Sequence, residues 1–161
     1  MLKKYKDHVE ERLQQGIPPL PLNAEQVADL VELLKSPPAG EEEFILDLIK
    51  NRTPAGVDPA AYVKAAFLTA LAKGETSSPL IDKKLATELL GTMLGGYNVE
   101  SLIKLLKDEE VGAIAADGLS KTLLMFNAKH EVIELAAENE NAKRVVESWS
   151  NGEWFLSLIH I

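Results

Sequence analysis

The sequence has no cysteine, and this absence excludes several kinds of chemistry at once. Without a thiol, the chain can form no disulfide, supply no thiolate nucleophile and hold no thiolate-ligated zinc or iron–sulfur cluster. Histidine is also scarce, since only His8, His130 and His160 occur and they are far apart in the sequence. They do not make a Ser–His–Asp set or a three-ligand metal site. We therefore predict no catalytic, cofactor-binding or metal-binding residue in this chain.

Long apolar runs and an excess of positive charge are missing as well. No stretch approaches the roughly 18 apolar residues that a bilayer-spanning helix needs, and the basic N-terminus continues into charged residues, not into the apolar core of a signal peptide. The net charge of −8 disfavours binding to nucleic acid or to anionic membranes. With 161 residues, 46% of them hydrophobic, the chain can bury the core of one domain, and we expect it to be cytoplasmic.

What the sequence does contain is a series of helix signals. No stretch longer than four residues alternates with the two-residue period of a half-buried strand. Apolar residues instead recur at helical spacing, as in Val27, Leu30, Val31 and Leu34. The pattern predicts a first helix over residues 3–15 and further helices that start near residues 23, 41, 58, 82, 98, 109, 130 and 141. An all-α fold of antiparallel helix pairs follows.

Several helix ends can be predicted from single residues. Asn23 and Gln26 have the spacing of a capping box. Asp58 offers an N-cap acceptor before a proline, and Gly74 can close the helix that begins there. This alanine-rich helix, with Phe67 near its centre, is predicted to be the most buried one.

Glycines suggest two further boundaries. Gly95 and Gly96 are expected to close the helix that starts at Asp82, and Gly118 to permit a break in the segment from Asp108 onward. That segment is predicted to pass through Ile114, Leu119 and Leu123 to Phe126.

Each chemically suggestive cluster also has a simpler interpretation. Glu41, Glu42 and Glu43 could bind a divalent metal, but three consecutive helical residues point in different directions, so favourable placement at a helix N-terminus is preferred. His130 and Glu134 share a helix face, yet two ligands are too few for a metal site. His8, with Asp7, Glu11 and Arg12 beside it, is interpreted as part of a charged helix surface.

Three other features of the sequence also have simple structural interpretations. Residues 91–96 superficially resemble a phosphate loop, but they lack its Gly-Lys-Ser/Thr ending and follow a helix, so a helix C-cap is preferred. Asn51-Arg52-Thr53 is a glycosylation sequon that is interpreted only as a helix end, since no secretory signal precedes it. Trp149 is expected in the core, whereas Tyr97 and Trp154 could pack either on the core or on a later domain.

Eight short segments, in order along the chain, carry a resemblance to a known family. They include Ala61-Tyr62-Val63-Lys64-Ala65 and Gly95-Gly96-Tyr97-Asn98, and the others are residues 30–35, 37–44, 72–75, 88–93, 122–126 and 153–156. Together they resemble the N-terminal segment of bacterial aconitate hydratase B, over roughly residues 1–156. The resemblance implies a HEAT-like array of stacked antiparallel helix pairs that precedes the catalytic domains.

The same resemblance implies a function for the parent protein. That family interconverts citrate and isocitrate through cis-aconitate in the tricarboxylic acid cycle, with related activity on 2-methylisocitrate, by means of a [4Fe-4S] cluster. This chain would be its non-catalytic accessory domain, which shapes substrate access and associates with the catalytic domains, with a second copy or with other proteins.

Two alternatives belong to other classes. The chain could be a free-standing helical adaptor that binds proteins, although residues 153–156 make better sense as the entry to a linker. RNA binding is a weaker reading, because the acidic charge opposes it. The ending Ser157-Leu158-Ile159-His160-Ile161 does not resemble the family's continuation. We therefore expect a domain over residues 1–156 and a non-family tail at a truncation point over residues 157–161.

Overall fold

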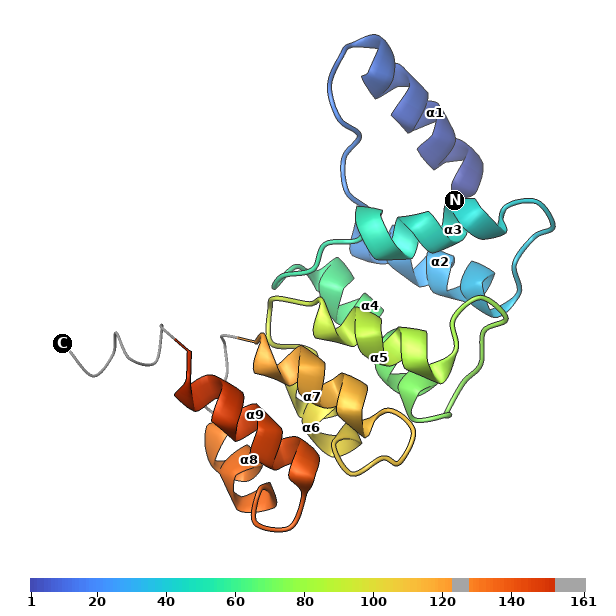
Figure 1. The fold of residues 1–161 in the computed structure, drawn as a ribbon. Coiled ribbons are helices and arrows are strands. Elements are labelled where there is room, and N and C mark those ends of the chain that lie inside the picture. Colours follow the sequence, from blue (N-terminus) through green and yellow to red (C-terminus); the bar gives the residue numbers. More distant parts are fainter. Residues whose placement is uncertain (123–127, 153–161) are drawn as a thin grey trace.

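The computed structural model describes residues 1–122 and 128–152, and these residues form nine α-helices and one π-helical segment, with no strand among them (Figure 1). The all-α prediction is confirmed for this part of the chain. The elements are α1 (Leu2–Gln14), α2 (Ala24–Lys35), α3 (Glu42–Asp47), η1 (Leu48–Arg52), α4 (Pro59–Ala72), α5 (Lys83–Gly91), α6 (Val99–Leu105), α7 (Gly112–Ser120), α8 (Lys129–Leu135) and α9 (Glu140–Ser150).

Helices α2 to α9 follow one another in a row, and each packs on helices close to it in sequence, whereas α1 projects from one end of the row (Figure 1). Helix α4 lies against α2 and α5, α5 lies against α7, and α7 contacts α6 and α9. Helix α8 covers α9 at the far end of the row. The hydrophobic core is therefore shared between neighbouring helices and runs along the row.

Three of the predicted helix ends, at Asn23, Asp58 and Gly74, form as expected. The Gln26 amide N–H donates to Asn23 Oδ1 over 2.9 Å, and the Asn23 N–H donates to Gln26 Oε1 over 3.0 Å. The Ala60 N–H donates to Asp58 Oδ1, and Gly74 adopts a φ of 73° just after α4. Local sequence therefore determines these helix ends.

Replacing Asn23 with alanine is expected to lower the free energy of unfolding by about 1 kcal/mol, because the first turn of α2 loses its side-chain acceptor. Urea denaturation of the whole chain measures the change. Asn23→Ser keeps an acceptor at the cap and serves as the matched control, with a much smaller expected loss. Equal losses in the two variants would contradict the capping role.

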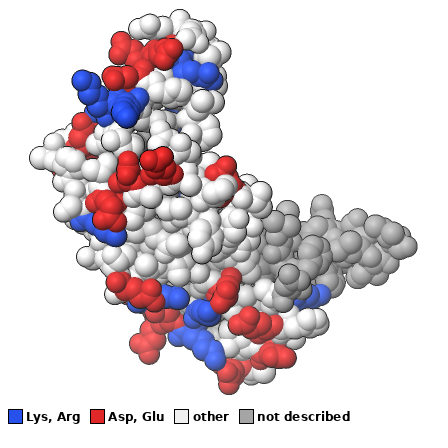
Figure 2. All heavy atoms as spheres, turned by 180° about the vertical axis from the view of Figure 1, so that it is seen from behind, with Lys and Arg blue, Asp and Glu red and all other residues white. Residues whose placement is uncertain are grey.

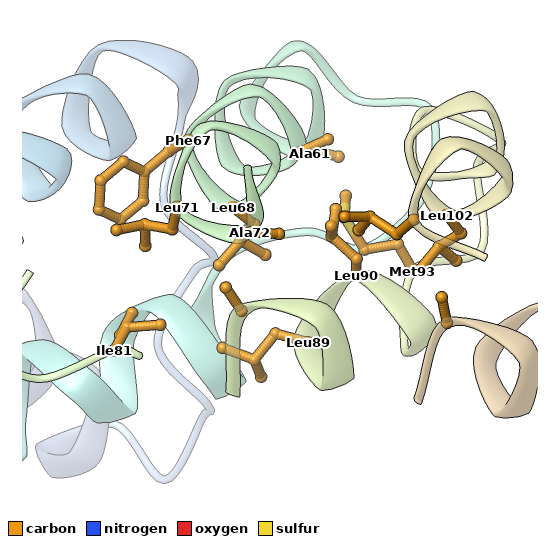
Figure 3. Close-up of a cluster of buried hydrophobic side chains, with 14 of the residues drawn as sticks. Ala61, Phe67, Leu68, Leu71, Ala72, Ile81, Leu89, Leu90, Met93 and Leu102 are labelled. Carbon is orange, nitrogen blue, oxygen red and sulfur yellow. The ribbon is translucent and has the colours of Figure 1, made fainter. Parts of the chain in front are cut away.

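Helix α4 has more buried residues than any other described helix, in agreement with the prediction (Figure 3). Leu68, Leu71 and Ala72 point into the cluster that also holds Ile81, Leu89 and Leu90. Val63 is only half-buried and Ala66 is exposed, so part of the helix surface faces solvent.

Lys64 lies on the buried face of α4. Only 1% of its surface is exposed, and its ammonium makes no hydrogen bond or ion pair with the part of the chain that the structure describes. Burial lowers the pKa of the Lys64 ammonium to about 8. The lysine was not singled out from the sequence, since charged residues are usually exposed.

The glycine-based boundaries were wrong. Helix α5 ends at Gly91 with Thr92 as its C-cap, so Gly95 and Gly96 lie in the following loop and do not close the helix. Helix α7 starts at Gly112 and continues through Gly118 without a break. The predicted extension of this segment to Leu123 and Phe126 lies outside the described residues.

Gly91 and Gly118 instead allow α5 and α7 to pack closely. A Cβ atom on Gly118 would lie 2.8 Å from the Gly91 Cα, and one on Gly91 would lie 3.0 Å from the Gly118 Cα. Both distances are too short for a methyl group without movement of the backbone. The two glycines therefore set the spacing between neighbouring helices, a role that depends on a partner far away in sequence.

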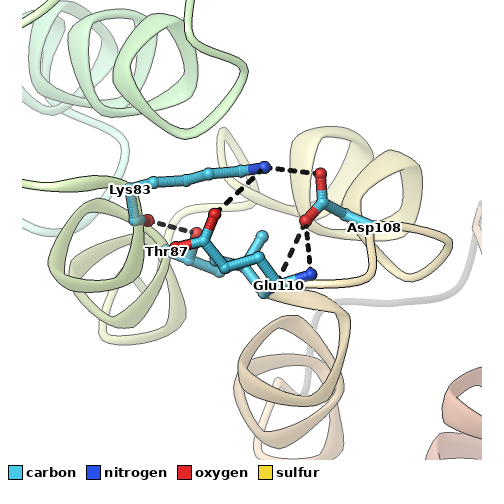
Figure 4. A network of polar contacts seen from close by, with 5 residues as sticks. Lys83, Thr87, Asp108 and Glu110 are labelled. Carbon is cyan, nitrogen blue, oxygen red and sulfur yellow. Dashed lines mark hydrogen bonds and ion pairs between the residues drawn. The ribbon is translucent and has the colours of Figure 1, made fainter.

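A polar network joins the start of α5 to the turn before α7 (Figure 4). Lys83 Nζ lies 2.7 Å from Asp108 Oδ2 and 3.8 Å from Glu110 Oε2. Asp108 Oδ1 in turn accepts the N–H groups of Glu110 and Val111. The hydrogen bond from Lys83 lowers the pKa of the Asp108 carboxyl, and the same bond raises the pKa of the Lys83 ammonium. Asp108 thus caps the turn, and α7 begins later than its predicted start.

Candidate functional site

The acidic cluster at the start of α3 is divided between two roles. Glu42 and Glu43 lie in the first helical turn, as predicted, whereas Glu41 is the N-cap residue. Glu41 accepts hydrogen bonds from Lys6 Nζ at 2.6 Å on both carboxylate oxygens, and Lys6 also lies 4.9 Å from the Phe44 ring centroid. This contact ties α1 to α3.

The two described histidines lie far apart in the fold. His130 and Glu134 are both exposed on α8. His8 Nε2 accepts the Leu20 N–H over 3.0 Å, and the hydroxyl of Tyr5 donates to the Leu20 carbonyl over 2.8 Å. His8 therefore holds the linker between α1 and α2 against α1, a role that no local pattern indicated. Within residues 1–122 and 128–152, no three His, Asp or Glu side chains are grouped as metal ligands.

The remaining motifs have structural roles in the described chain. Thr53 of the sequon is buried and donates to the Leu48 carbonyl, so this motif is a helix end. Trp149 is buried, as predicted, and its indole N–H donates to the Leu119 carbonyl over 3.0 Å. Tyr97 is exposed, whereas Trp154 lies outside the described residues.

Two loops cross at one edge of the row, between η1 and α4 and between α5 and α6. The Leu94 N–H donates to the Ala55 carbonyl over 2.7 Å. At the crossing, a Cβ atom on Gly95 would lie only 2.0 Å from the Gly56 carbonyl oxygen. Glycine at position 95 is thus required by the close approach of the other backbone. The crossing holds both loops in one arrangement.

Four apolar or aromatic side chains project from this crossing, and we call them the tyrosine patch. They are Val57, Tyr62, Leu94 and Tyr97, with exposed fractions of 73%, 61%, 73% and 39%. The two tyrosine rings meet edge to face with their centroids 5.4 Å apart, and the Tyr97 hydroxyl donates to the Val57 carbonyl over 3.1 Å. The patch is therefore apolar, exposed and held in place by contacts within the chain.

A hollow with a volume of about 750 Å³ adjoins the tyrosine patch, between the C-terminal ends of α5 and α7. Leu94 belongs to both features, since it also lines the hollow. The other lining residues are Glu88, Gly91, Thr92, Met93, Ile114, Asp117, Gly118, Lys121 and Thr122. Residues 91–94, which superficially resembled a phosphate loop, thus form one wall of this hollow.

Helix α9 lies next to the hollow. Arg144 Nη2 lies 3.1 Å from the carboxylate of Asp117, which lines the hollow. The Trp149 indole N–H donates to the carbonyl of Leu119, three residues before Thr122, which also lines it. Helix α9 ends at Ser150 and packs against α7 (Figure 1).

The charge pattern bears on nucleic-acid binding, and the helix lengths bear on membrane insertion. On the face drawn in Figure 2, acidic and basic side chains are interspersed, and no basic stripe typical of a nucleic-acid groove is visible. None of the described helices is both long and apolar enough to cross a bilayer.

Comparison with known proteins identifies close relatives. The family model described as the aconitate B N-terminal domain matches residues 4–155. The chain is 64% identical over 156 residues to aconitate hydratase B of Pseudomonas aeruginosa, and the match covers 96% of this chain and 18% of the relative.

More distant relatives have the same name. The chain is 60% identical to aconitate hydratase B of Escherichia coli, over 98% of its own length, and 45% identical to that of Helicobacter pylori, over 97%. In both cases it covers 18% of the relative. The chain thus spans about a fifth of the length of these curated relatives.

Proposed function

Because the chain belongs to the family of aconitase B N-terminal domains, we propose that it acts as the accessory helical domain of a hydro-lyase of the aconitate hydratase B type. The observation that carries the proposal is the family match over residues 4–155 together with the 18% share of each relative. The parent would interconvert citrate and isocitrate in the cytoplasm. The row of helix pairs is interpreted as a HEAT-like array.

The residues of this chain do not fit the iron–sulfur cluster that the parent would use. The chain has no cysteine, and an iron–sulfur cluster is held by cysteine thiolates. In this proposal the cluster and its ligands belong to the rest of the parent protein. This domain contributes a shaped surface, which limits access to the active site and supports association with other protein segments.

Deleting residues 1–156 from a full-length parent is expected to change its KM, its kcat or its assembly state while the iron content stays the same. Cis-aconitate hydration and iron content, measured on the same preparations, separate these effects. The control is the present chain alone, which should show no hydration of cis-aconitate and bind no cluster. Unchanged kinetics and assembly after the deletion would contradict the proposed function, as would turnover by the purified chain.

A further inference from the structure

The linker between α1 and α2 has few backbone hydrogen-bond donors. Three of the residues in 17–22, which we call the proline linker, are prolines and have no backbone N–H. The first and last residues of the linker donate to the backbone carbonyls of Arg12 and Arg52. The Leu20 N–H, which lies between two prolines, donates instead to a side chain, the imidazole of His8. The proline linker therefore depends on this imidazole for its one central backbone bond.

One face of α1 contacts the proline linker, which runs back beside this helix towards α2 (Figure 1). Tyr5, His8 and Arg12 are three and four residues apart, so they share a face of the helix. The Tyr5 hydroxyl donates to the Leu20 carbonyl over 2.8 Å, and His8 Nε2 accepts the Leu20 N–H over 3.0 Å. Arg12 Nε donates to the Pro18 carbonyl over 3.0 Å. Both backbone polar groups of Leu20 are thus bound by side chains of α1.

The direction of the Leu20 hydrogen bond determines the protonation state of His8. A backbone N–H can only donate, so Nε2 is the ring nitrogen without a proton and the imidazole is neutral. A further proton would make Nε2 a donor that faces another donor. We therefore propose that His8 makes the attachment of the proline linker to α1 dependent on pH: the neutral imidazole holds the linker, and the protonated imidazole releases the Leu20 N–H. This inference goes beyond the proposed function and does not depend on it.

The groups around His8 leave the imidazole as the responding one. Histidine is the side-chain type that ordinarily changes charge between pH 5 and 8. Burial raises the pKa of the Tyr5 hydroxyl, which therefore keeps its proton and its bond to the Leu20 carbonyl in this range. The proline linker contributes no titratable side chain. The charged residues of α1, α3 and η1 on this side of the molecule are Lys4, Lys6, Asp7, Glu11, Arg12, Glu41, Asp47 and Arg52.

Loss of the His8 bond should loosen the linker without unfolding the row of helices. Prolines on both sides of Leu20 offer no other N–H that could replace the lost donor. Helix α1 keeps its remaining contacts, which include the buried Tyr5 ring and the ion pair of Lys6 with Glu41. Acidification should therefore open the N–H half of the contact at Leu20 and leave the core of the domain intact.

NMR spectroscopy of the whole chain tests the proposal. Long-range proton–nitrogen spectra report which ring nitrogen of His8 carries the proton, and we expect it on Nδ1 at pH 8. Amide hydrogen exchange, corrected for the intrinsic rate at each pH, reports the Leu20 bond. Between pH 8 and 5.5 the protection of the Leu20 amide should fall about fivefold, the size expected for one lost hydrogen bond, along the same curve as the protonation of His8. Leu68, buried in α4, is the internal reference and should keep its protection.

Two variants separate His8 from other causes of a pH dependence. His8→Gln has no titratable proton at this position, so the protection of the Leu20 amide should no longer change with pH. His130→Gln removes the exposed histidine of α8 and is the matched control, in which the fivefold change should persist. A proton on Nε2 at pH 8, Leu20 protection that does not follow the protonation of His8, or an unaltered pH dependence in His8→Gln would overturn the proposal.

Discussion

Replacing Phe67 with alanine is expected to lower the free energy of unfolding by about 3–5 kcal/mol. Phe67 lies on α4 with only 5% of its surface exposed, close to Leu71 in the core (Figure 3). Removing the ring loses its transfer free energy and leaves a cavity between helices whose backbones are fixed by other contacts. Equilibrium denaturation of the whole chain measures the loss.

Tyr62→Ala is the matched control for Phe67→Ala. Tyr62 is an aromatic residue on the same helix, but 61% of its surface is exposed. Its truncation removes the edge-to-face contact with Tyr97 and should cost about 1 kcal/mol or less. If the two variants lose similar stability, or if Phe67→Ala loses less than about 1 kcal/mol, Phe67 does not have the core role described here.

Lys64→Met is expected to stabilise the chain at pH 7, by on the order of 3 kcal/mol. The reason is that the folded chain buries the Lys64 side chain, whose ammonium has no hydrogen-bond or ion-pair partner among residues 1–122 and 128–152, and this burial lowers its pKa from 10.5 to about 8. A shift of one pKa unit corresponds to about 1.4 kcal/mol. Methionine keeps a similar length and removes the charge.

The gain should depend on pH in a defined direction. Below pH 8 both the folded and the unfolded chain carry the Lys64 charge, so the full cost of burying it applies. Between pH 8 and 10.5 the unfolded chain binds the proton while the folded chain releases it, so the stability of the unmodified protein rises with pH. The advantage of Lys64→Met should therefore shrink across this window and vanish above it.

Denaturation curves at pH 7, 9 and 10.5 measure this trend. Lys84→Met, at an exposed position on α5, is the control and should change stability by no more than about 0.5 kcal/mol at any of these pH values. A destabilising effect of Lys64→Met at pH 7, or a gain that does not fall between pH 8 and 10.5, would show that the buried ammonium is stabilised by its surroundings.

Features with a local cause could be predicted from the sequence. The capping box at Asn23, the N-cap at Asp58 and the left-handed residue Gly74 each depend on a few neighbouring residues, and all three form as expected. The family resemblance, which rests on ordered short segments, was also confirmed by the comparisons. Periodicity located the helices because apolar spacing reflects the buried face of each one.

Features that need a distant partner could not be predicted in this way. Gly91 and Gly118 were interpreted as a cap and a break, whereas they bring two helices together across the core. His8 was placed on a charged surface, although it accepts a hydrogen bond from the linker residue Leu20. The tyrosine patch combines Val57, Tyr62, Leu94 and Tyr97. These residues come from two parts of the chain about 40 residues apart, which the crossing of two loops brings together.

Helices α2 to α9 pack on helices close to them in sequence, and this arrangement bears on how the chain can fold. The longest-range hydrogen bond in the described part of the chain joins the Ser78 hydroxyl to the Leu34 carbonyl, across 44 residues. Because these contacts join residues that are near in sequence, they close only short loops. Such a low contact order is associated with rapid folding. During synthesis at about 5–20 residues per second, each helix meets its partners within seconds of leaving the ribosome. The domain can therefore complete its core step by step, without waiting for sequence that is translated later.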